Sequence, residues 1–161
     1  MIDFITRRHQ TLLTSLACLA FLATGPLFAA TTAENILKAI DGKNGLIVVI
    51  GGENTESAKV AAGLGKSGDS LVHAIAGSAD ELARINKAIA KAGVKGCVSA
   101  EELGVEALPY RDFMVNSLVI MDLPKAEAAG FKMKEALRCV VPQGKIVICN
   151  KGKVVKTNDA P

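Results

Sequence analysis

Short apolar runs alternate with amphipathic segments from residue 33 to residue 149. The runs predict strands at Leu46–Ile50, Ser70–Ile75, Ser117–Asp122 and Lys145–Cys149, with a weaker strand at Val94–Ser99. Between them, apolar residues recur every three or four positions and predict helices at 33–40, 54–64, 78–92 and 126–139. Because strands alternate with helices, the pattern predicts an α/β fold with a doubly wound, mainly parallel sheet of about five strands and helices on both faces.

Cap and turn residues mark the ends of these elements. Ser78 and Glu81 have the spacing of a capping box and open the third helix, which Gly93 ends. Residues 101–112 read as a loop, and Pro142-Gln143-Gly144 predicts a turn before the last long strand. We expect one more short strand at Val154–Val155 and a loose polar tail at 156–161.

The first 30 residues have the pattern of a secretory signal peptide. Arg7 and Arg8 precede an apolar run from Leu12 to Ala30, which ends in small residues. The pattern predicts cleavage after Ala29 or Ala30 and export to the periplasm or the extracellular space. A retained membrane anchor is the alternative, since the run approaches the roughly 20 residues of a membrane span. Cleavage leaves 131 residues, which we divide into one domain at 31–155 and the tail.

Composition narrows the function classes. Without the leader the net charge is about +2, and the chain has no Trp and one Tyr, so basic and aromatic surfaces for nucleic acid are not expected. Cys97, Cys139 and Cys149 match no zinc spacing, and no metal site is expected. We interpret them as small buried residues, with one disulfide pair as the alternative.

Two features that suggest chemistry have simpler interpretations. Gly63-Leu64-Gly65-Lys66-Ser67 resembles part of a phosphate-binding loop, but Val60 stands at the position of its first glycine and the segment leads from a helix to a strand. His73 lies inside an apolar strand and is expected to be a hydrogen-bonded core or interface residue. The sequence shows no Ser–His–acid set, so it assigns no catalytic residue.

The segment from Leu46 to Thr55 carries the strongest functional signal. An apolar strand ends in Gly51-Gly52, and Glu53-Asn54 lead into a helix, which is the usual order of a nucleotide-cofactor cradle. Glycines let the ligand approach the backbone, and the helix start offers free N–H groups. Asn54 or Thr55 would serve equally as a helix N-cap. Asp122, at the carboxyl end of another strand, is a further candidate, with a cap for the next segment as the alternative.

The order of these motifs resembles the class I S-adenosylmethionine-dependent methyltransferases, over about Asn35 to Ile148. Leu46–Gly51 looks like the first strand of that family and its opening glycine. The segment from Leu108 to Asp122 is similar to the family pattern LPF-x-D…FD-x-V, and Leu137–Ile148 is similar to L-R-x-L-K-P-G-G-x-L-V-I. The resemblance implies a Rossmann-like fold and S-adenosylmethionine as cofactor. It implies contacts from the turn at Gly51, Gly52, Glu53 and Asn54. The family often has an acid near the adenine after the third strand, where Glu101 and Glu102 stand here, with a solvated pair as the alternative.

A narrower resemblance concerns the context of the domain. A signal peptide followed by the LPY-x-D…VN variant is similar to a group of exported bacterial proteins, in which a methyltransferase-like domain precedes a PQQ-type β-propeller. This resemblance implies a propeller domain or protein as partner, with membrane contact only through an uncleaved leader.

The sequence departs from the family at two points of cofactor contact. Glu53 and Thr55 stand where a G-x-G-x-G turn starting at Gly51 would have glycines. Ala76 stands where the family has an acidic residue that holds both ribose hydroxyls, and losing such a contact costs about 1–3 kcal/mol. S-adenosylmethionine is also made inside the cell, whereas the leader predicts export. We therefore predict a non-catalytic binding or scaffold module with a degenerate cofactor site. The alternatives are an active methyltransferase of unknown acceptor, or a binder of another nucleotide such as NAD.

Overall fold

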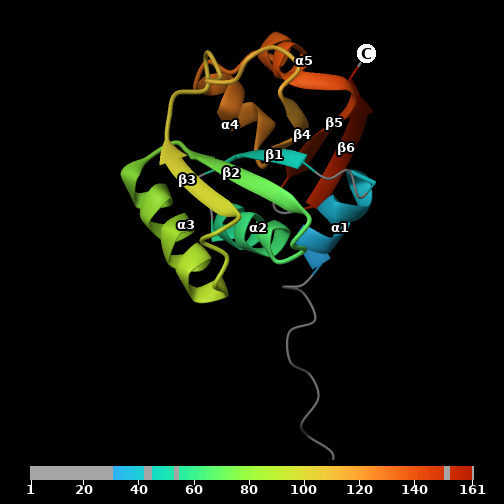
Figure 1. The fold of residues 1–161 in the computed structure, drawn as a ribbon. Coiled ribbons are helices and arrows are strands. Elements are labelled where there is room, and N and C mark those ends of the chain that lie inside the picture. The colour runs from blue at the N-terminus through green and yellow to red at the C-terminus, as the bar shows by residue number, and fades with distance from the viewer. Residues whose placement is uncertain (1–30, 42–44, 53–54, 151–152, 161) are drawn as a thin grey trace, which may run out of the picture.

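The computed structural model describes residues 31–41, 45–52, 55–150 and 153–160, and the leader lies outside them. Its centre is a six-stranded sheet in the order β3-β2-β1-β4-β5-β6, in which β1 to β5 run parallel and β6 runs antiparallel to β5 (Figure 1). The strands are β1 Gly45–Ile50, β2 Ser70–Ala76, β3 Val98–Glu102, β4 Val115–Ile120, β5 Val140–Asn150 and β6 Lys153–Asp159.

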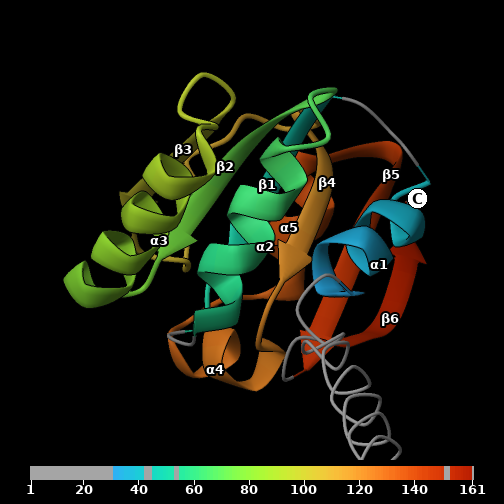
Figure 2. The same cartoon turned by 90° about the horizontal axis from the view of Figure 1, so that it is seen from below.

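Helices cover both faces of the sheet, which confirms the predicted doubly wound fold. Among the described helices, α1, α2 and α3 lie on one face of the sheet and the shorter α4 and α5 on the other (Figures 1 and 2). The first face carries α1 Thr31–Ala39, α2 Thr55–Gly65 and α3 Ala79–Ala92; the second carries α4 Leu123–Ala128 and α5 Met133–Cys139. Among the described helices, none is long and apolar enough to cross a membrane.

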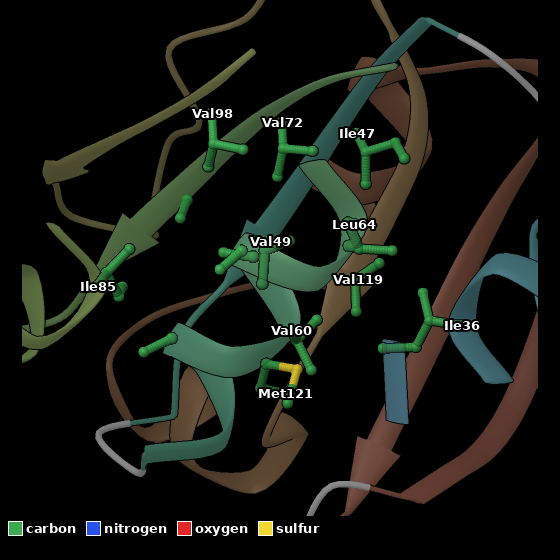
Figure 3. Packing of buried hydrophobic residues seen from close by; sticks show 14 of the residues in the cluster. Ile36, Ile47, Val49, Val60, Leu64, Val72, Ile85, Val98, Val119 and Met121 are labelled. Atoms are coloured by element: carbon green, nitrogen blue, oxygen red, sulfur yellow. The ribbon is translucent and has the colours of Figure 1, made fainter. Parts of the chain in front are cut away.

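The sheet separates two apolar cores, because successive side chains of a strand point to opposite faces. Ile47 and Val49 of β1 pack with Val60 and Leu64 of α2 in the core of the first face (Figure 3). Val48 and Ile50 of the same strand belong to the second core. β1 is therefore buried on both sides, which explains why its sequence is apolar throughout.

The residues that begin and end α3 are those that the sequence predicts, Ser78 and Gly93. The Ser78 hydroxyl accepts a hydrogen bond from the backbone N–H of Glu81 at 3.3 Å. Gly93 ends the helix in the left-handed conformation, with φ of 72°, which glycine adopts without steric strain.

The predicted single helix at 126–139 is wrong, because the chain forms α4 and α5 there. Asp122 caps α4, and Gly130 has φ of 94°, a conformation that interrupts the helix before α5 begins. The helical spacing of apolar residues continues across the break, which is why the sequence pattern missed it.

Three boundaries at the sheet also differ from the prediction. β3 begins only at Val98, after a turn, and extends through Glu102 into the predicted loop. Pro142-Gln143-Gly144 lies inside β5 as an irregularity, with Gln143 at φ of 61°, instead of forming a separate turn. The expected loose tail is wrong for residues 156–159, which belong to β6 and pair with β5.

Candidate functional site

A cleft of about 540 Å³ opens at the carboxyl ends of the parallel strands. It lies where the strand order reverses between β1 and β4, the position at which open α/β sheets bind ligands. Turns after β1, β2 and β3 form its walls, together with α4. The lining residues are Ile50, Gly51, Gly52, Ile75, Gly77, Glu81, Glu102, Leu103, Gly104, Val105, Glu106, Lys125, Ala126 and Ala129.

Glu81 is the most unusual residue of this cleft, since its side chain is ionisable yet the residue is only 1 % exposed. Its Oε1 accepts hydrogen bonds from the Ser57 hydroxyl at 2.7 Å and from the Gly52 N–H at 3.2 Å. Its Oε2 accepts one from the Gly77 N–H at 3.0 Å. The carboxylate thus connects the turn after β1, the turn after β2 and helix α2, and its burial is balanced by these donors.

The carboxylate of Glu81 also explains Gly51. A Cβ atom on Gly51 would lie 2.7 Å from the Glu81 Cδ and 2.9 Å from its Oε2, closer than real Cβ contacts allow. Glycine is therefore needed at this turn to admit a side chain of the protein itself. Gly52 contributes differently, through the N–H that Glu81 accepts.

Comparison with solved structures identifies the architecture. A protein of Methanococcus maripaludis assigned to the S-adenosylmethionine-dependent methyltransferases matches with a TM-score of 0.62 and 21% identity, over 76% of this chain and 55% of that one. Geranyl diphosphate C-methyltransferase from Streptomyces coelicolor, with S-adenosylhomocysteine bound, gives 0.60 and 15%, over 72% and 43%. The cyclase SpnF gives 0.63 and 16%, over 74% and 44%. No family model and no curated protein matches the sequence.

The chain has the fold of S-adenosylmethionine-dependent methyltransferases. The resemblance read from the sequence is confirmed at the level of the fold. The chain spans about half the length of these structures. A shared fold hosts many chemistries, so function has to be argued from the cleft.

The structure separates the residues predicted to bind a cofactor. Gly51 and Gly52 line the cleft, whereas Glu53 and Asn54 lie outside the described residues. Glu102 lines the cleft, but its neighbour Glu101 lies beside His73 instead, because alternate residues of β3 face opposite sides.

Asp122 takes the capping role that the sequence left open. Its carboxylate accepts a hydrogen bond from the Lys125 N–H at 3.1 Å as N-cap of α4. It is not among the residues that line the cleft, while Lys125, one turn later, is.

Sequence reasoning missed Glu81 and Glu106 as residues of the cleft. The pattern assigned Glu81 only to a capping box, whose acid would return to the N–H of Ser78. The carboxylate accepts from Gly77 and Gly52 instead. The sequence does not indicate that Glu81 contacts the turn after β1, because Gly52 of that turn lies 29 residues earlier in the chain.

A second polar cluster holds the segment between β3 and β4, residues 103–114. The Arg138 guanidinium of α5 donates to the carbonyl oxygens of Tyr110 at 2.8 Å and Leu108 at 3.1 Å, and to Asp112 Oδ1 at 2.9 Å. It also pairs with Glu135 at 2.7 Å. Two of the motifs that carried the sequence resemblance, at 108–112 and 137–148, are thereby joined into one unit.

Replacing Arg138 should loosen this segment more than replacing Arg111, an exposed arginine within it. Arg138→Ala removes three donors to segment 103–114, so we expect faster amide hydrogen exchange at 108–112 and a melting temperature lower by several degrees. Arg111→Ala should leave both unchanged. Equal effects of the two substitutions would mean that general charge, and not these hydrogen bonds, orders the segment.

The same cluster predicts a loss of stability in acid. The hydrogen bond from Arg138 holds the pKa of Glu135 below its usual value. A carboxyl group with a lowered pKa stabilises the fold above its unfolded-state pKa of about 4.3, and this stabilisation is lost as the pH falls through the folded-state value. Thermal unfolding from pH 6 down to pH 3 should show a smaller acid loss in Glu135→Gln than in the unchanged protein; equal slopes would contradict the assignment.

Two of the three described cysteines are buried, as the sequence predicts, and Cys97 is partly buried. Cys97, Cys139 and Cys149 are unpaired in the described structure, and the last two are buried. Burial raises the pKa of the Cys149 thiol to about 11, so it stays protonated and unreactive at neutral pH.

Proposed function

We propose that this chain is an exported methyltransferase-like domain that no longer binds S-adenosylmethionine and acts as a non-catalytic binding or scaffold module. Its working partner would be a PQQ-type β-propeller domain or protein. The observation that carries the proposal is the Glu81 carboxylate, which takes the backbone donors of the two turns that a cofactor would approach.

The end of β2 supports the loss of cofactor binding. Ala76 is fully buried there, and its methyl group offers no hydrogen-bond acceptor to a ribose. Glu102 is its register partner on β3 and is exposed at the cleft. A single exposed carboxylate one strand away gives a weaker and less ordered contact than a bidentate one fixed at the strand end.

Glu81 is poorly suited to replace the missing acid. Both of its oxygens already accept hydrogen bonds from the protein, and the side chain has almost no exposed surface. Binding a ribose through Glu81 would compete with the Gly52 N–H and the Ser57 hydroxyl, which belong to buried residues, and a buried donor that loses its acceptor costs about 1–3 kcal/mol. The carboxylate therefore stabilises the fold and is not available to bind a ligand.

Other members of the fold support a function apart from methyl transfer. SpnF has the same fold and is a cyclase. The alternative for this chain, an active methyltransferase, keeps one argument in its favour, namely the open cleft between glycine turns.

The proposed export can be tested through cleavage of the leader. Signal peptidase cleavage after Ala29 or Ala30 gives a mature protein that begins at Ala30 or Thr31. Expression of the full chain, followed by intact-mass measurement of the exported protein, should find one of these two masses. A membrane-bound chain that keeps Met1 would identify the leader as an anchor.

Thermal unfolding tests the loss of the cofactor. A ligand at 100 times its dissociation constant stabilises a folded protein by about 2.7 kcal/mol. A site with micromolar affinity would therefore raise the melting temperature by several degrees in 1 mM S-adenosylhomocysteine. We expect no rise, and a rise of that size would favour the methyltransferase reading.

A further inference from the structure

His73 and Tyr110 form a polar contact between the sheet and segment 103–114. The Tyr110 hydroxyl lies 2.7 Å from His73 Nδ1, and the two rings meet edge to face, with their centroids 5.9 Å apart. His73 belongs to β2, and Tyr110 lies in the segment that covers this strand. Burial raises the pKa of Tyr110, so its hydroxyl stays protonated and is able to donate to Nδ1.

The direction of this hydrogen bond decides where the proton of a neutral imidazole lies. When Nδ1 accepts from Tyr110, the proton of the neutral ring lies on Nε2. Nε2 is buried and has no hydrogen-bond partner in the described structure. The nearest carboxylate oxygen, Glu101 Oε2 of β3, lies 4.0 Å away, and the Glu101 side chain is 63% exposed. An exposed side chain can cross this gap by a small change of rotamer.

We propose that Tyr110, His73 and Glu101 form an acid-sensitive latch between segment 103–114, β2 and β3. When a proton from solvent binds Nδ1, the Tyr110 hydroxyl turns to accept it, and the positive ring draws the Glu101 carboxylate onto Nε2–H. Three elements are then connected through one chain of side chains. Imidazole is the side chain whose charge ordinarily changes between pH 5 and 8.

The surroundings of His73 allow this charge. Glu101 is the carboxylate that faces His73. The other titratable or charged groups around the ring come from the turn before β3, from segment 103–114 and from α5. They are Lys95, Cys97, Tyr110, Arg138 and Cys139. β1 presents the apolar Leu46 and Val48 on this side. Lys95 is exposed and screened by solvent, so the carboxylate at 4.0 Å is the dominant neighbour of Nε2.

The latch would act on the cleft through the segment that it holds. Leu103, Gly104, Val105 and Glu106 line the cleft, and Tyr110 follows four residues later. Fixing Tyr110 more firmly to β2 and β3 should reduce the mobility of this wall in acid.

Two neighbouring glutamates give a matched test. Glu101→Gln removes the proposed partner, whereas Glu102→Gln removes an equal charge that faces the cleft. In 0.15 M salt, the His73 ring titration is followed by NMR in the unchanged protein and both variants. The chain has two histidines, His9 and His73, so His73→Gln assigns the signal. Amide protection of residues 103–112 is measured at pH 7.5 and pH 5.5.

We expect Glu101→Gln to lower the midpoint of the His73 titration by roughly half a pH unit and to abolish the gain in amide protection at pH 5.5. Glu102→Gln should preserve both. Tyr110→Phe should lower the protection of 103–112 at either pH, because it removes the hydroxyl but keeps the ring. The proposal is overturned if Glu101→Gln behaves like the unchanged protein, or if Glu102→Gln has the same effect as Glu101→Gln.

Discussion

Glu81→Ala should lower the free energy of unfolding by about 3 kcal/mol and the melting temperature by about 10 °C. The substitution leaves the N–H groups of Gly52 and Gly77 and the Ser57 hydroxyl without the acceptor that they now share. Gly52 and Ser57 are buried, and a buried donor that loses its acceptor costs about 1–3 kcal/mol, whereas the exposed Gly77 can bond to water and adds less to the sum. Chemical denaturation of the two proteins measures the difference.

Two further variants separate the hydrogen bonds from general effects. Asp80→Ala removes an exposed acid from the same helical turn and should change stability by less than about 0.5 kcal/mol. Glu81→Gln keeps the size of the side chain but places an amide NH₂ among N–H donors, so it should lose much of the same stability. If Glu81→Gln were as stable as the unchanged protein, the acceptor role assigned to this carboxylate would be wrong.

Gly51→Ala is expected to destabilise the protein by about 2 kcal/mol, because the added methyl group overlaps the Glu81 carboxylate. The backbone of Gly51 lies outside the left-handed region, so this effect is steric and needs no conformational argument. Gly96→Ala is the matched control, since a Cβ on Gly96 has no atom within 4 Å. The control should stay within about 0.5 kcal/mol of the unchanged protein.

The double variant tests whether the two residues act through each other. Once Glu81 is alanine, the methyl group on residue 51 no longer meets the carboxylate, so Gly51→Ala should cost at least about 1 kcal/mol less in that background. Additive effects would show that Gly51 is glycine for some other reason, such as the approach of a ligand.

The sheet could be predicted from sequence because its strands are buried on both faces. β1 is apolar after Gly45 and β4 ends in the apolar run Leu118–Ile120, and both alternate with amphipathic helices, a pattern typical of a covered parallel sheet. The ends of the helices and strands were harder to predict. The apolar spacing of a helix persists across Gly130, where a positive φ breaks it. β6 is largely exposed and polar, so its seven residues carried almost no signal beyond Val154–Val155.

The site was less accessible to sequence reasoning. Gly51 and Gly52 are local to one turn, and the strand–turn–helix pattern located them at the cleft. The role of Glu81 depends on two turns that meet only in the folded sheet, and a residue pattern does not encode that distance. Glu101 and Glu102 are adjacent in sequence, yet the pleat of β3 sends them to opposite sides, and the predicted strand ended before either of them.

The central proposal is that this methyltransferase-like domain does not bind S-adenosylmethionine, and titration calorimetry with residues 31–161 tests it most directly. S-adenosylmethionine and then S-adenosylhomocysteine are titrated to millimolar concentration into protein whose folding is verified by its cooperative unfolding. We predict no heat of binding, because Ala76 offers no acceptor and Glu81 is engaged by the backbone. Micromolar binding of either ligand would contradict the account and would direct the search to a methyl acceptor.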